Sequence, residues 1–176
     1  MHTLLTRLGL DSFSSKQEHN LLIVTITEND LPRVAQALLA THECLLKTVV
    51  ATDERTTRQL FFIRYVFGVP KESLFIALSL AVDPYALTFP SLVSVSQSFA
   101  LYEQEIKSMF GLEPVGHPNP TRIILHKHYP TDTYPLRKDF AWDTPFPLQT
   151  EDTITEVQGV EGEGIYQIPV GPVHAG

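Results

Sequence analysis

The fold class is decided by residues 60–67, LFFIRYVF, and by residues 73–82, SLFIALSLAV. Both runs are rich in aromatic and aliphatic residues of the kind that favours β-strands. In the second run, the even-numbered residues from 74 to 80 are all leucine or isoleucine, so they share one face of a strand. A turn that contains Pro70 separates the two runs. We therefore expect them to pair as antiparallel strands.

Other segments extend this pair in both directions. Residues 21–27 and 44–51 are also rich in β-forming residues, and a polar turn at residues 53–58 leads from the latter into the first run. Between them, apolar residues at positions i, i+3, i+4 and i+7 from Leu31 predict a helix with one buried face. The pattern predicts an α+β fold, with an antiparallel or mixed sheet of about four strands and helices on one face.

A second helix and a long extended arm follow. Residues 91–110 place apolar side chains at helical spacing, and Gly111 suits the left-handed position that ends a helix. Prolines recur beyond it, and only residues 123–125 look like a short strand. We therefore expect an α+β domain at 1–111, an extended segment packed on it at 112–150, and an acidic linker at 151–176.

The charge of the chain is concentrated at its carboxyl end. The net charge is −7, and residues 151–176 carry five acidic and no basic side chains. A nucleic-acid-binding protein needs a basic face, so this class is excluded. A single cysteine cannot build a disulfide framework or a cluster of cysteine ligands, and no apolar stretch approaches the ~20 residues of a membrane helix. We expect a cytosolic protein that meets a membrane only through partners.

Two carboxylates on the second expected helix are candidate acid–base groups. Glu103 and Glu105 lie two residues apart and point to different sides of a helix, so they cannot form one acid–base pair. Glu103 borders the apolar stripe, where a half-buried carboxylate needs a cation. The nearby cations are Arg122, Arg137 and Lys138, so an ion-pair cluster is expected there.

Three histidines are candidate metal ligands. His117, His126 and His128 could together hold Zn²⁺, but their spacing is loose and their segment is rich in proline. Cys44 lies in an expected strand, where a thiol is commonly buried and inert. The sequence has neither a Gly-x-Ser-x-Gly nucleophile motif nor a glycine-rich phosphate loop. No catalytic, cofactor-binding or metal site is expected, and the chain has the character of a binding or structural module.

Four motifs follow one another between residues 102 and 140. They read YEQEIKSMFGL at 102–112, GHP at 116–118, RIIL at 122–125 and PLRKDF at 135–140. In this order and at this spacing they resemble the 30 kDa subunit of respiratory NADH dehydrogenase (complex I). The resemblance covers most of residues 1–140.

Three charged positions of that family pattern are neutral in this chain. Gln104 and Thr121 stand where the family has arginine, and Ser108 stands where it has aspartate. Any ion-pair network that the family builds at these positions must therefore be rearranged here.

The carboxyl end carries a second resemblance. Residues 164–176 read GIYQIPVGPVHAG and are similar to a junction in the large subunit of energy-converting nickel–iron hydrogenases, of the formate hydrogenlyase and hydrogenase 4 type. In those proteins a domain like the 30 kDa subunit precedes a catalytic domain that opens with a G-P-x-H segment like Gly171–His174. We therefore expect residues 151–176 to lead towards a large-subunit domain that is missing or separate.

The resemblance implies a non-catalytic assembly domain of an NADH dehydrogenase-like or nickel–iron hydrogenase complex. Its expected partners are a large subunit, of the NADH dehydrogenase or the nickel–iron type, and a small iron–sulfur subunit. Iron–sulfur clusters and a nickel–iron site or a flavin are expected in those partners, with none in this chain. The complex is expected on the inner face of the cell membrane. The residues expected at the subunit interface are Glu103, Glu105, His117, Arg122, Arg137, Lys138, Asp139 and His174.

Two other functions are also compatible with the sequence. One is a small metal-dependent enzyme that uses His117, His126 and His128. The other is a stand-alone adaptor whose acidic tail is a regulatory arm.

Overall fold

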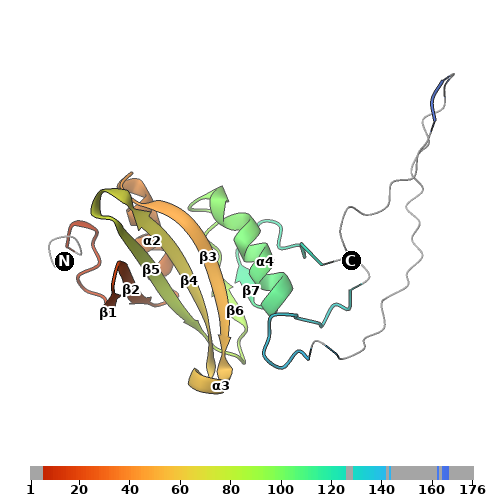
Figure 1. The fold of residues 1–176 in the computed structure, drawn as a ribbon, viewed down its shortest axis with the longest axis horizontal. Helices are drawn as coiled ribbons and strands as arrows, with labels where there is room; N and C mark the ends of the chain where they lie inside the picture. The colour runs from red at the N-terminus through yellow and green to blue at the C-terminus, as the bar shows by residue number, and fades with distance from the viewer. Residues whose placement is uncertain (1–5, 126–128, 142, 144–161, 163, 167–176) are drawn as a thin grey trace.

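The computed structural model has a mixed five-stranded sheet at its centre (Figure 1). It describes residues 6–125, 129–141, 143, 162 and 164–166. The strand order across the sheet is β1-β2-β5-β4-β3. The strands are β1 (Ser15–Glu18), β2 (Leu21–Ile26), β3 (Leu45–Glu54), β4 (Leu60–Val69) and β5 (Leu74–Val82).

The three expected central strands form an antiparallel meander, and β2 joins it in parallel beside β5. The α+β class and the mixed sheet are therefore confirmed. The sheet has one strand more than the expected four, because β1 pairs with β2 as a hairpin. All four residues of β1 are exposed and its sequence is SKQE, so no apolar alternation marks it.

Helices and a small second sheet complete the fold. The 3₁₀ helix η1 follows β4, and the short parallel pair of β6 and β7 flanks α4 along the chain. The bounds are α2 (Leu31–Ala40), α3 (Arg55–Arg58), η1 (Pro70–Glu72), β6 (Thr88–Pro90), η2 (Gln97–Phe99), α4 (Ala100–Phe110) and β7 (Glu113–Val115).

The core lies on one face of the sheet, where α2 and α4 cover alternate side chains of β4. Phe61 meets Phe110 of α4 edge to face, with ring centroids 6.5 Å apart, and Tyr65 meets Phe99 in the same way at 6.0 Å. The residues that α2 buries in the same core are Leu31, Val34, Ala35 and Leu38. The helices therefore lie on one face, as expected.

Two expected elements are wrong in their bounds. Regular helix begins only at residue 97, because residues 91 and 92 are bonded to the side chain of Glu103 in a loop. Residues 123–125 are no strand, since Ile124 has a φ of 73°, which a strand cannot accommodate. The short strand of this region is β7, at Glu113–Val115.

No helix in the part of the chain that the structure describes is long and apolar enough to cross a membrane.

At Gly111, the end of α4 touches Tyr134 and Arg137 of the extended segment 112–150, which we call the arm. This glycine has a φ of 67°, the left-handed conformation expected for a helix end. A Cβ added there would lie 2.5 Å from Cζ of Tyr134 and 2.8 Å from Nη2 of Arg137. Position 111 therefore requires glycine for two reasons, the positive φ of its backbone and the close approach of the arm.

We predict that Gly111→Ala destabilises the protein by at least about 2 kcal/mol, because backbone strain and steric clash add. Gly9→Ala is the matched control, since Gly9 also has a φ of 67° but has no atom within 4 Å of an added Cβ. It should cost only the strain, about 1 kcal/mol. Thermal unfolding of the two variants measures the difference, and equal losses would show that the arm does not pack on the helix end.

Candidate functional site

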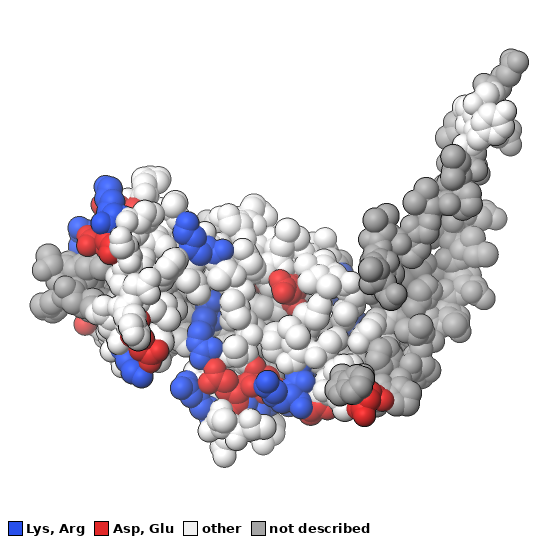
Figure 2. Space-filling model, in the orientation of Figure 1, with Lys and Arg blue, Asp and Glu red and all other residues white. Residues whose placement is uncertain are grey.

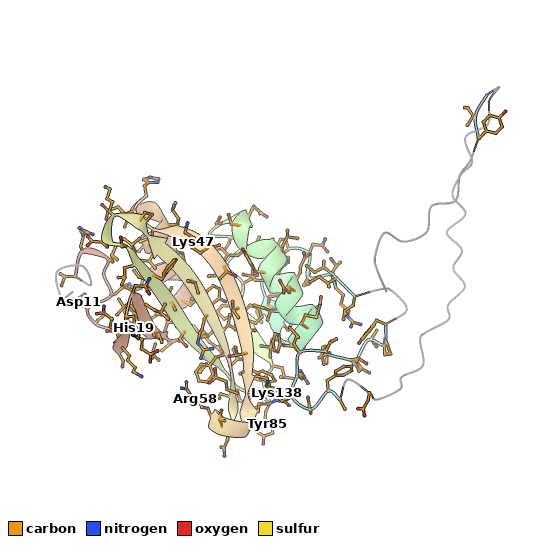
Figure 3. The ribbon with its side chains drawn as sticks, in the orientation of Figure 1. Asp11, His19, Lys47, Arg58, Tyr85 and Lys138 are labelled. Carbon is orange, nitrogen blue, oxygen red and sulfur yellow. The ribbon has the colours of Figure 1, made fainter. Side chains whose placement is uncertain are left out.

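The segment PLRKDF is fastened to the sheet at the end of β3 by one buried carboxylate, Asp53. The backbone N–H of Lys138 donates to Oδ2 of Asp53 at 2.8 Å. Arg55 donates to both oxygens of the same carboxylate, from Nε at 2.9 Å and from Nη2 at 2.6 Å. Figure 3 shows Lys138 beside this end of β3 and β4. One acceptor thus holds the strand end and the arm together.

Arg55 extends this link to a second carboxylate of the arm. Its guanidinium bonds Asp139 at 2.9 and 3.2 Å and lies 4.7 Å from the ring centroid of Phe61. The hydrogen bonds from Arg55 lower the pKa of Asp53 to about 2 and also lower the pKa of Asp139. Both carboxylates raise the pKa of Arg55. The cluster is therefore ionised and intact at neutral pH.

Arg137 fixes the arm to the end of α4. Its Nε donates to the carbonyl oxygen of Phe110 at 2.6 Å, and the backbone N–H of Leu136 donates to that of Met109 at 3.2 Å. The guanidinium also lies 4.3 Å from the ring centroid of Tyr134. These bonds satisfy carbonyl groups that a helix end leaves unpaired.

Arg122 holds the loop before PLRKDF in the same manner. It donates to the carbonyl oxygens of Pro130, at 3.0 Å, and Thr133, at 3.2 Å. Arg122 and Arg137 therefore both stabilise the path of the arm through bonds within the chain.

The expectation that Glu103 pairs with a nearby cation is wrong. Glu103 is fully buried in α4, and its carboxylate accepts the hydroxyl of Ser91 at 2.6 Å and the backbone N–H of Leu92 at 2.7 Å. Burial raises the pKa of Glu103. The hydroxyl of Tyr65, whose pKa burial also raises, has no hydrogen-bond partner among the described residues. Backbone and hydroxyl donors thus take the place of the expected cations.

His117 is buried and bonded at both ring nitrogens. Its Nδ1 accepts the backbone N–H of Asn119 at 3.0 Å, so in the neutral ring Nε2 carries the proton and donates to the carbonyl oxygen of Ala100 at 3.2 Å. Neither nitrogen has a lone pair free for a metal ion. In the described part of the chain, no group of three His, Cys, Asp or Glu side chains could hold a metal, and His126 and His128 lie outside that part.

The three neutral replacements of the family pattern lie together on α4 and the chain beside it. Gln104 donates to the carbonyl oxygen of Asn119 at 2.7 Å and to the hydroxyl of Thr121 at 3.2 Å. Ser108 donates to the carbonyl oxygen of Gln104 and accepts the backbone N–H of Ile123 at 2.9 Å. Uncharged side chains at these three positions therefore form hydrogen bonds with one another and with the backbone. Each neutral residue thus has a partner that needs no charge.

The remaining motif residues face outward. Glu105 is exposed on α4 and forms no ion pair with another described residue, and the side chain of Lys138 is exposed although its backbone is bonded. Leu136 and Ile124 are apolar and more than half exposed. His174 lies outside the described residues.

No sequence pattern marks the two residues that fasten the arm. Asp53 and Arg55 stand in a stretch whose composition predicts only a polar turn, and 84 residues separate Arg55 from Asp139. A bond over such a distance leaves no spacing pattern in one sequence.

Comparison with known proteins places this geometry in a family. Residues 24–145 match the family model described as "Respiratory-chain NADH dehydrogenase, 30 Kd subunit". The chain is 33% identical over 161 residues to hydrogenase-4 component G and 29% identical over 161 residues to formate hydrogenlyase subunit 5, both of Escherichia coli K12. Each match covers 90% of this chain but only 29% and 28% of those relatives.

A solved structure shows the same fold. It is a chain of the membrane-bound sulfane sulfur reductase, an archaeal respiratory membrane complex, with a TM-score of 0.67 at 13% identity. The match covers 94% of this chain and 98% of that one. The fold therefore occurs as a nearly complete chain in one complex and as less than a third of a longer chain in the Escherichia coli relatives.

We predict that Asp53→Asn destabilises the protein by about 2 kcal/mol at pH 7, because the pKa of Asp53 lies about two units below its unfolded value. A lowered pKa stabilises the fold above the unfolded pKa, so the wild-type advantage should disappear as the pH falls from about 4 towards 2. Urea unfolding across this pH range measures it, with exposed Asp11→Asn as the control. A difference that does not change with pH would contradict the ionised cluster.

Glu103→Gln should unfold at the same temperature as the wild type or higher at pH 7, because it removes a buried charge and keeps an acceptor for Leu92. The pKa of Glu103 is raised above its unfolded value, so the wild type loses stability as the pH rises from the unfolded pKa to the folded pKa. The benefit of Gln should grow over that range and stay constant above it. Glu103→Ala loses both bonds and should cost about 2–4 kcal/mol. Exposed Glu105→Gln is the control. Loss of stability in Glu103→Gln equal to that in Glu103→Ala would contradict this account.

Proposed function

Because the chain belongs to the family of the 30 kDa subunit of respiratory-chain NADH dehydrogenase, we propose that it is a non-catalytic assembly domain that docks the large subunit of a membrane-bound oxidoreductase complex. The observation that carries the proposal is that some motif residues bond within the chain while others face outward. Glu103, His117, Arg122 and Arg137 are bonded within the chain. The bonds of His117 and Arg137 join the arm to α4, and those of Arg122 hold the arm to itself. Those of Glu103 fix α4 to the loop before it.

The outward residues of α4 and the arm are the proposed contact surface. Leu136, Ile124, Glu105 and Lys138 combine exposed apolar side chains with charges of both signs. A rigid backbone reduces the entropy that is lost on binding, and a surface of this composition suits a protein partner. The partner in contact with it is the large subunit, or the large-subunit domain where the two are fused.

The redox chemistry of the complex belongs to neighbouring subunits in this proposal. Iron–sulfur clusters and a nickel–iron site or a flavin lie in the large subunit and in a small iron–sulfur subunit. The complex lies on the inner face of the cell membrane, and this chain supports electron transfer by holding its neighbours in place. The bonded ring nitrogens of His117 argue against the alternative of a histidine-dependent metalloenzyme.

We predict that Lys138→Glu and Leu136→Asp lower the recovery of the large subunit at least tenfold when the complex is purified through a tag on the full-length chain. Both side chains are exposed, so the unfolding temperature of the chain should change by less than about 2 °C. Arg137→Ala, in contrast, should lower both the recovery and the unfolding temperature, because Arg137 braces the arm.

Arg33→Glu is the matched control for Lys138→Glu, since it makes the same change of charge at an exposed position on α2. It should leave the recovery unchanged. Where the large subunit and this domain form one polypeptide, protection of the Lys138 peptide bond from trypsin in the intact complex is the equivalent measurement. Full recovery or full cleavage would rule out docking through this surface.

A further inference from the structure

The second face of the sheet is apolar but uncovered. Strands β4 and β5 read LFFIRYVFGV and LFIALSLAV, and such nearly continuous apolar runs are typical of strands that are covered on both faces. The helices cover only one face. Within the described ranges, no helix or strand packs against the other.

We call this uncovered surface the open face. Cross-strand partners form rows on it: Ile23 lies beside Ala77, which lies beside Val66, and Leu21 lies beside Phe75. One row further along, Val50 lies opposite Arg64. Val50 is 44% exposed and Phe75 is 40% exposed. A β-branched and an aromatic side chain in such positions indicate a surface that a partner covers.

Basic side chains occupy the middle and both ends of the open face. A hollow of about 250 Å³ is lined by Lys16, Arg58, Phe62, Arg64 and Ser79, among others. The guanidinium carbons of Arg58 and Arg64 each lie 5.2 Å from the ring centroid of Phe62. Two guanidinium groups thus lie against one aromatic ring.

Carboxylates only partly balance these cations. Glu54 pairs with Arg64 at 2.6 Å and with Arg58 at 3.3 Å, and Glu18 pairs with Lys16 at 2.6 Å. At the other end of the face, an added Cβ at Gly68 would lie 2.7 Å from Cε of Lys47, so this side chain lies across Gly68.

The open face therefore carries positive charge on a chain whose net charge is −7. Figure 2 looks onto it, and most of the surface over β3, β4 and β5 is neutral, with blue side chains in the middle and a mixed band of charge towards α3. Lys47 and Arg58 are labelled at its two ends in Figure 3. The complementary surface is apolar and acidic.

We propose that the open face is a second docking surface, which binds a segment of another protein subunit of the same complex. The segment places apolar side chains over Val50, Val66 and Phe75 and a carboxylate over Arg58 and Arg64. This inference rests on the proposed function, because it requires that the chain is part of a complex. It adds a partner contact on the side of the sheet opposite to α4.

The distribution of charge disfavours a second copy of this chain as the occupant. A two-fold dimer through the open face would bring a face with unbalanced cations against an identical one. Arg64 is also held to Thr52 at 2.7 Å and to Glu54, so it cannot easily turn away from such a contact. A partner that brings its own carboxylate removes this repulsion.

Photocrosslinking in the intact complex tests the proposal. The crosslinking amino acid p-benzoylphenylalanine replaces Val50 or Phe75 on the open face, and Leu136 on the arm, in the full-length chain. We expect crosslinks from Val50 and Phe75 to a segment with Asp or Glu among apolar residues, at a place distinct from that reached from Leu136. Crosslinks from Leu136 alone, or crosslinks from Val50 to another copy of this chain, overturn the inference and leave the proposed function standing.

Charge variants test the role of the arginine. Arg64→Glu should lower the recovery of the crosslinked subunit at least tenfold, Arg64→Lys should lower it less, and Arg33→Glu on the opposite side should have no effect. Val50→Asp is a second variant in case Arg64→Glu unfolds, which thermal unfolding reveals. Unchanged recovery in folded Arg64→Glu and Val50→Asp overturns the inference.

Vesicles provide the remaining test. The purified chain should not float with vesicles of phosphatidylcholine and phosphatidylglycerol, and flotation that Arg64→Glu abolishes would identify an anionic membrane as the occupant and overturn the proposal. Absence of crosslinks at all three positions, together with normal recovery in Lys138→Glu, would remove both this inference and the proposed function.

Discussion

The structure depends on the carboxylate of Asp53. Its two oxygens accept both a guanidinium from the next turn of chain and a backbone N–H from the arm, so the end of the sheet and PLRKDF share one acceptor. Because Asp53 is buried, an unpaired donor or acceptor here would cost more than it does at the surface. Among the described residues from 116 to 141, none belongs to a helix or a strand, and these hydrogen bonds take the place of strand pairing.

The family motifs serve two purposes at once. Some of their residues, such as Arg122 and Arg137, donate to carbonyl oxygens and so give the arm a fixed path. Others, such as Glu105 and Lys138, lie outward on that path. The motifs combine residues that bond within the chain with residues that face outward. Their order and spacing therefore indicate the family better than any single motif does. The neutral cluster around Gln104 fits this division, because its hydrogen bonds to Asn119 and Thr121 join α4 to the chain beside it.

Local features are predictable from the sequence, and distant contacts are not. The buried stripe of α2 from Leu31 and the left-handed Gly111 follow from spacing and from backbone chemistry near the residue itself. Strand β1 could not be predicted, because its residues are polar and exposed and only its pairing with β2 makes it a strand. The partners of Glu103 could not be predicted either, because one of them is a backbone N–H, which every residue but proline carries and which no residue type reveals. The same holds for Asp53, whose acceptor role emerges only when residue 138 reaches it.

The parallel pairing of β2 with β5 joins two segments that lie far apart along the chain. Leu21 lies beside Phe75, far along the chain, whereas β3, β4 and β5 pair through short turns. Closing the longer loop costs more entropy, so we expect the meander to form before the hairpin of β1 and β2 joins it. During synthesis at ~5–20 residues per second, β2 leaves the ribosome several seconds before its partner exists. Throughout that interval the apolar residues of β2 lack the strand that they pair with in the folded sheet.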